Sequence, residues 1–206
     1  MPAFLDFSLV LETPDDVGVR RQLLGHFQQT FYRWLGSITK IWLVDYKNQK
    51  SETSYLDITS ALNCHLGVSE ILIIDFAGLP PEGRAVLCIS KNVPSATVYT
   101  MAISAADLVN HPRLMSDLLL ELLSAARILG IRSAVAAGEE LEIEESIQSI
   151  SGLVTAASSN LSLIEYLCIE PDDLPPPAEL ESITERDRML VLRRRSSWMS
   201  TAGSHP

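Results

Sequence analysis

The sequence predicts an α+β fold, in which two or three helices pack on one face of a mostly antiparallel sheet. Two observations lead to this class. Most candidate strands follow one another through short polar turns, which is typical of an antiparallel meander. Two longer segments instead repeat apolar residues every three or four positions, as helices with a buried side do. A sheet with helices on one face buries both kinds of element.

Strands are predicted where apolar residues alternate with polar ones, or form a short run between turn residues. The run at 70–76, EILIIDF, is apolar on both faces, so we expect it inside the sheet. Residues 59–66 are compatible with either a helix or a loop. The other predicted strands are 4–11, 38–46, 55–58, 85–90, 97–103, 132–137, 161–169 and 189–192.

The first helix is predicted to begin at 13–16 (TPDD), where a threonine hydroxyl can cap it and proline suits the first turn. Gly36 is expected to end this helix. A third helix is expected over 146–158, although Gly152 and neighbouring serines lower its intrinsic helix propensity.

The central helix is predicted over 110–130, with Asn110 as its cap, Pro112 in the first turn and Gly130 just past its end. Apolar residues cover most of its circumference, so we expect it to be covered on more than one side. It is interpreted as a scaffold that delivers the chain to the segment after 132–137. Its polar residues fall on one narrow stripe: Arg113, Asp117, Glu121, Ser124 and Arg127.

The composition is that of a globular protein, with 47% hydrophobic and 20% charged residues. A chain of 206 residues can bury one sizeable core. We predict a single α+β domain at 1–195 and a flexible tail at 196–206.

The formal net charge of −10 argues against a nucleic-acid partner, because nucleic-acid binders usually display a basic face. The opening segment lacks the basic residues of a signal peptide, and no apolar run is long enough to span a bilayer. We therefore expect a cytoplasmic protein with no membrane partner. An acidic surface suits a basic protein partner, although acidity also serves solubility.

No motif for catalysis, cofactor binding or metal binding is present, so we predict no catalytic residue, no cofactor, no metal and no enzymatic activity. Cys64, Cys88 and Cys168 lie far apart and lack metal-binding spacing, which indicates buried free thiols. The alternative is a small enzyme or ligand-binding domain whose site combines dispersed residues such as Cys64, His65 and Asp75.

The segment 139–145 (EELEIEE) is the sharpest local feature, since five of its seven residues are glutamates. In an extended chain the acids at alternate positions share one face and Leu141 and Ile143 share the other. The segment is either a solvated edge strand or a docking surface for a basic protein. The predicted partner-binding residues are Glu139, Glu140, Glu142, Glu144 and Glu145, with Asp172 and Asp173 as a second set.

The C-terminal region is locally basic, with arginines at 186, 188 and 193–195. Such a cluster could bind an anionic surface. In a chain this acidic we favour internal pairing with the acidic segment, or solvation of the last strand.

The acidic total, the α+β layout, the glutamates of 139–145 and the missing catalytic motifs together resemble the small acidic immunity proteins encoded beside bacterial polymorphic and contact-dependent toxins. This resemblance implies a non-enzymatic protein that binds and neutralises a cognate protein partner, a toxin. If the toxin is a nuclease with a basic cleft, the acidic face would mimic nucleic-acid phosphates. Self-association, for example as a homodimer, is the remaining alternative.

Overall fold

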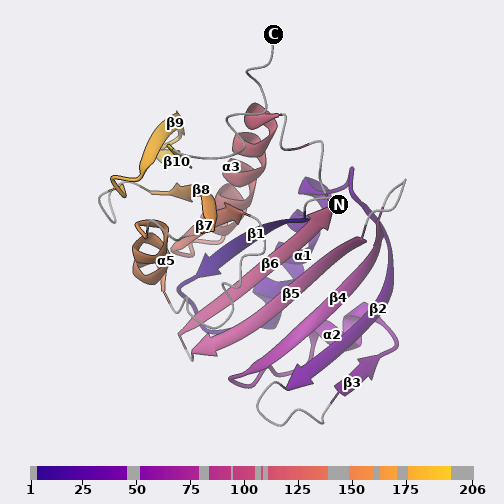
Figure 1. The fold of residues 1–206 in the computed structure, drawn as a ribbon. Helices are drawn as coiled ribbons and strands as arrows, with labels where there is room; N and C mark the ends of the chain where they lie inside the picture. Colours follow the sequence, from indigo (N-terminus) through magenta and orange to yellow (C-terminus); the bar gives the residue numbers. More distant parts are fainter. Residues whose placement is uncertain are drawn as a thin grey trace.

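The computed structural model describes residues 4–45, 52–78, 84–93, 95–104, 108, 111–138, 149–159, 163–170 and 176–195 (Figure 1). These residues form ten strands and four helices. In chain order the elements are β1 (Phe4–Leu11), α1 (Val17–Thr30), β2 (Leu35–Asp45), β3 (Glu52–Tyr55), α2 (Ile58–Leu62), β4 (Glu70–Gly78), β5 (Arg84–Val93), β6 (Ala96–Ser104), α3 (Pro112–Ile128), β7 (Ser133–Gly138), α5 (Ile150–Ala157), β8 (Ile164–Ile169), β9 (Leu180–Arg186) and β10 (Met189–Arg194).

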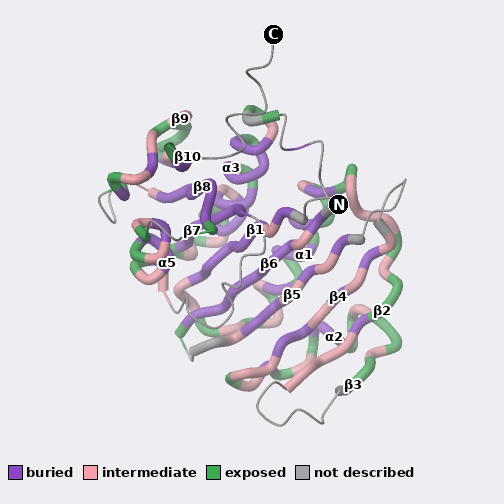
Figure 2. Tube along the Cα trace, viewed as in Figure 1, coloured by how far each residue is buried: buried purple, intermediate pink, exposed green. Residues whose placement is uncertain are grey.

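All ten strands belong to one sheet, in the order β3-β2-β4-β5-β6-β1-β7-β8-β10-β9. Every neighbouring pair is antiparallel, which confirms the predicted α+β class. The strand β1 lies near the middle, between β6 and β7, and joins the two halves of the sheet. Figure 2 shows that burial is greatest in this middle region and falls toward β2 and β3.

The main core lies between one face of the sheet and the helices α1, α2 and α3. Side chains alternate between the faces of a strand, so Phe7 and Leu9 of β1 share this face with their cross-strand partners Met101 and Tyr99 of β6. All four side chains are fully buried. The positions of α1 and α3 on this face agree with the prediction, and α2 shows that the segment 59–66, which was compatible with a helix or a loop, begins as a helix.

The helix predicted over 146–158 is α5, but it packs on the opposite face, over β7 and β8, and not beside the other helices as predicted. It contacts a second core that includes Val10, Ala134, Ala136 and Leu167. Because β7 is apolar on both faces, its sequence does not reveal which side a helix covers.

The strands β2, β4, β5 and β6 carry no described helix on that opposite face (Figure 1). Trp42, Ile73, Val86 and Cys88 lie on it and are half-buried. The Lys40 ammonium sits 4.1 Å from the ring centroid of Trp42, so a cation covers part of the tryptophan.

The predicted start and end of the first helix are wrong. Asp16, rather than Thr13, is the N-cap, and its carboxylate accepts a 2.9 Å hydrogen bond from the Val19 amide. The helix α1 ends at Thr30, and Gly36 lies inside β2 instead. A Cβ atom at Gly36 would be 2.5 Å from the Ala77 carbonyl oxygen, so close contact between β2 and β4 requires glycine there.

The central helix is confirmed as α3, but its cap differs from the prediction. Pro112 occupies the first turn, and the N-cap residue His111 makes no capping hydrogen bond with its side chain. The predicted cap, Asn110, lies outside the described residues. Gly130 adopts φ +69° just past the end, the left-handed conformation that glycine favours.

The strand β9 was missed by the sequence analysis, which predicted only its partner β10. A tight turn joins the two strands, and Asp187 and Arg188 both have positive φ there, at 51° and 65°. Such a turn matches the twist of a hairpin, but its usual signal is glycine or asparagine. Within the described residues, no helix is long and apolar enough to cross a membrane.

Candidate functional site

The helix α3 exposes one narrow stripe of polar side chains, and a groove lies on each side of that stripe. Arg113, Asp117, Glu121 and Arg127 are exposed, as the predicted stripe requires. Asp117 lines both grooves. The buried part of α3 holds the two grooves in place, because it packs on α1, β7, β8 and β10.

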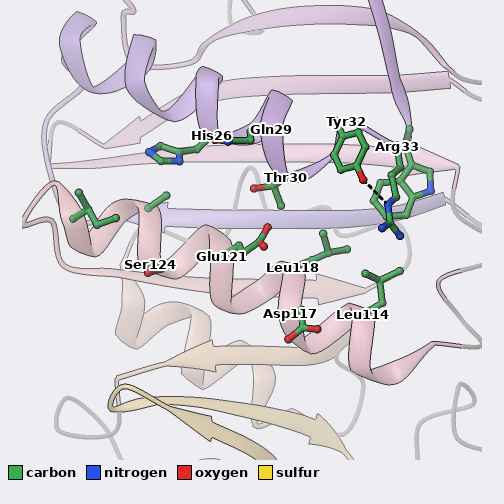
Figure 3. Close-up of a pocket in the computed structure, with 13 residues that line it drawn as sticks. His26, Gln29, Thr30, Tyr32, Arg33, Leu114, Asp117, Leu118, Glu121 and Ser124 are labelled. Atoms are coloured by element: carbon green, nitrogen blue, oxygen red, sulfur yellow. Dashed lines mark hydrogen bonds between the residues drawn. The ribbon is translucent and has the colours of Figure 1, made fainter.

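The first groove lies between α1 and α3 and is called the helix groove (Figure 3). The two helices are antiparallel here, and the groove has a volume of about 440 Å³. Its floor is apolar, because Leu118 and Ala125 are buried and Leu114 is half-buried. His26 and Thr30 project from α1 on the other side.

Two large apolar side chains stand exposed at opposite ends of the helix groove. Tyr32, just beyond α1, is 62% exposed, and Ile128, at the end of α3, is 75% exposed. Glu121 lies between them, and within the described residues its carboxylate has no hydrogen bond or ion pair. Arg33 donates a 3.0 Å hydrogen bond to the Tyr32 hydroxyl, which raises the pKa of Arg33.

The second groove lies between the N-terminal half of α3 and the hairpin β9–β10, and is called the arginine groove. Its volume is about 470 Å³. Three arginines line it together with one carboxylate, two hydroxyl groups and one aliphatic side chain. The lining residues are Arg113, Ser116, Asp117, Ile183, Thr184, Arg186 and Arg193.

A buried ion pair anchors the start of α1 but does not form a surface site. The Arg20 and Asp15 side chains are only 1% and 3% exposed, and the guanidinium binds both carboxylate oxygens. Arg20 also donates to the Leu62 and Cys64 carbonyls, at 3.2 and 2.7 Å, and so holds the end of α2. Burial opposes the charge of Arg20, but the bonds to Asp15 outweigh it and raise the Arg20 pKa.

The glutamates of 139–145 and the acids Asp172 and Asp173 lie outside the described residues. The partner-binding role predicted for them therefore stays a prediction. The last described residue before the glutamates is Gly138, which ends β7 and pairs with Asp6 of β1.

The dispersed residues of the alternative site are not brought together. Cys64 packs against the core on the helix-covered face, with Arg20 Nη1 3.7 Å from its sulfur. Asp75 lies between the core residues Ile74 and Phe76 of β4, so it is on the opposite face of the sheet. Within the described residues, no three metal-binding side chains are grouped closely enough to hold an ion.

The cysteines of the described chain are free thiols. Cys168 is buried, as predicted, and burial raises its pKa to about 12, which keeps the thiol protonated. Cys64 and Cys88 are only half-buried, which differs from the prediction: Cys64 follows the end of α2 at the edge of the main core, and Cys88 lies on the sheet face that no described helix covers.

The C-terminal arginines have separate roles. Arg193 and Arg186 pair internally with Glu181 at 2.7 Å and Asp117 at 3.2 Å, whereas the predicted pairing was with the acidic segment 139–145, which lies outside the described residues. Arg194 does not solvate the last strand, because it is buried. It donates hydrogen bonds to three carbonyls at the end of α5 and the start of β8: those of Ala157, Ser159 and Ile164.

No family model matches the chain, and no curated protein does. Among solved structures, the Pseudomonas aeruginosa T6SS protein PA0821 is similar with a TM-score of 0.48 and 12% identity, over 93% of this chain and 66% of that chain. The toxic C-terminal tip of CdiA from Pseudomonas aeruginosa in complex with immune protein is similar with a TM-score of 0.37 and 10% identity, over 69% of this chain and 91% of that chain. Both scores are below 0.5, so neither likeness decides the function of this chain.

Proposed function

We propose that this chain is a non-enzymatic binding protein that recognises a cognate protein partner through the helix groove. The groove combines an apolar floor with the exposed side chains Tyr32 and Ile128, as protein-binding surfaces do. The Glu121 carboxylate between them favours a partner segment with apolar anchors and a basic side chain.

The partner we propose is a bacterial toxin that the chain neutralises, as the immunity proteins that it resembles do. The net charge of −10 supports a basic partner, since opposite charges accelerate association and reject acidic competitors. The glutamates of 139–145 would be a second contact in this proposal.

The experiment starts from the proteins encoded by the reading frames next to this gene. Each is expressed alone to test whether it stops growth, and then together with this chain to test for rescue. Binding of the purified pair is measured by calorimetry. Charge reversal by Glu121→Arg should raise the Kd by about tenfold or more, because a basic partner side chain would face a new cation.

Glu185→Arg is the matched control, since Glu185 is exposed on the edge strand β9 and does not line the helix groove. It changes the net charge equally and should leave the Kd within about twofold. Equal weakening by both variants would show that only the overall charge matters. The absence of a toxic neighbour that binds would contradict the proposed function.

The acidic segment is tested separately by the triple reversal Glu140→Lys, Glu142→Lys and Glu144→Lys. If these residues contact the partner, association should slow and its salt dependence should weaken. Unchanged binding would remove 139–145 from the interface and leave the helix groove as the proposed site.

A further inference from the structure

The arginine groove is a positive site on an acidic protein. Three guanidinium groups and the Asp117 carboxylate line it, and the Glu181 carboxylate is paired with Arg193, which leaves one surplus positive charge at the groove of a chain with net charge −10. Arg113 belongs to α3, Arg186 to β9 and Arg193 to β10, so three separate elements bring these side chains to one place.

A β-bulge shapes the wall of the groove. Val191 of β10 pairs with Thr184 of β9, but the next residue, Leu192, pairs with Ser182, so Ile183 is the extra residue. In a regular strand Ile183 and Thr184 would point to opposite faces, yet both line the groove. Thr184 shares the face of Arg186 by regular alternation, so the bulge adds the aliphatic side chain of Ile183 to the side that carries Arg186 and Arg193.

The guanidinium groups keep hydrogen-bond donors that internal pairing does not use. Arg193 binds Glu181 through Nη2, but its Nε is buried and has no partner within the described residues. Arg186 binds Asp117 through Nη2. Arg113 makes no hydrogen bond or ion pair with any described residue, although guanidinium offers five N–H donors.

We propose that the arginine groove binds a phosphate monoester group. A phosphate carries a charge of about −1.5 to −2 at neutral pH and three strong acceptor oxygens, so the surplus positive charge attracts it and its oxygens can accept hydrogen bonds from the unused donors. Compared with a phosphate, a carboxylate carries about half the negative charge and has one acceptor oxygen fewer. This proposal does not depend on the helix groove or on the identity of a toxin.

The test titrates the full chain with inorganic phosphate and, separately, with acetate. Arginine Nε–H signals are followed by NMR, and affinities are measured by calorimetry. Phosphate should give saturable shifts at Arg186 and Arg193, and acetate should bind more weakly. Arg113→Gln should weaken phosphate binding by about tenfold or more, because it removes a charged donor that no described residue engages.

Arg33→Gln is the matched control, since it removes the same charge from the helix groove and should leave phosphate binding unchanged. A phosphoserine peptide and its unphosphorylated form complete the series. Tighter binding of the phosphopeptide than of inorganic phosphate would assign the group to a phosphorylated polypeptide, and equal binding to a free phosphate ester; both support the site. Unsaturable phosphate shifts, or equal affinity in wild type and Arg113→Gln, would overturn the proposal.

Discussion

At the scale of single residues, Arg20 is the side chain whose loss should harm the fold most directly. It is buried and serves two elements, since it neutralises Asp15 and binds the Leu62 and Cys64 carbonyls at the end of α2. Arg20→Met would leave a buried carboxylate without its cation and two carbonyls without this donor. We expect a loss of about 3–5 kcal/mol in the free energy of unfolding, measured by urea denaturation.

Asp15→Asn is the informative comparison. It keeps the shape of the side chain and leaves the buried guanidinium without its anion, but the carbonyl bonds of Arg20 stay in place, so it should cost less than Arg20→Met. If the two variants were equally destabilised, the carbonyl contacts would contribute nothing measurable. Arg21→Met controls for the loss of one charge, because Arg21 is exposed on the same helix.

At the scale of elements, two glycines should respond to alanine in opposite directions. Gly130 has φ +69° after α3, so Gly130→Ala should destabilise by about 1–2 kcal/mol. Gly25 is exposed within α1, and a Cβ atom there would meet nothing within 4 Å. Gly25→Ala should therefore stabilise by about 0.5–1 kcal/mol. Thermal denaturation measures both, and a stabilising Gly130→Ala would contradict the role of glycine at the end of α3.

The elements that the sequence predicts well are those with a strong local signal. The sequence predicts a strand over 70–76, which is β4, because a continuous apolar run lies between turn residues. It predicts α3 because the apolar positions of that segment repeat at helical spacing. The strand β9, LESITER, has only two apolar residues, and its place depends on pairing with β10 and on a turn without glycine. Such a strand is specified by its partner, so local pattern does not reveal it.

The same limit applies to the candidate site. The sequence separates the polar stripe of α3, including Arg113 and Glu121, from its buried side. It does not indicate that α1 lies along one border of this stripe and the hairpin β9–β10 along the other. Each groove combines segments that are distant in sequence, so only the sheet order brings them together. The sequence predicts a scaffold role for α3, and its position between two grooves supports a second role.

At the scale of the whole molecule, the continuous sheet predicts that both halves unfold together. One core on the helix-covered face extends from Ile74 of β4 to Met189 of β10, and β1 joins the halves. In a Trp198→Phe background, fluorescence reports the β2 half through Trp34 and Trp42, while circular dichroism reports the whole chain. Both signals should give one coincident urea transition.

Two core substitutions in opposite halves of the sheet test this cooperativity. Ile74→Ala and Met189→Ala should each lower the free energy of unfolding by about 2–5 kcal/mol in both signals. Ile128→Ala, at a side chain that is 75% exposed, should change it by less than about 0.5 kcal/mol. A Met189→Ala effect on circular dichroism without an effect on fluorescence would instead show two independently unfolding units.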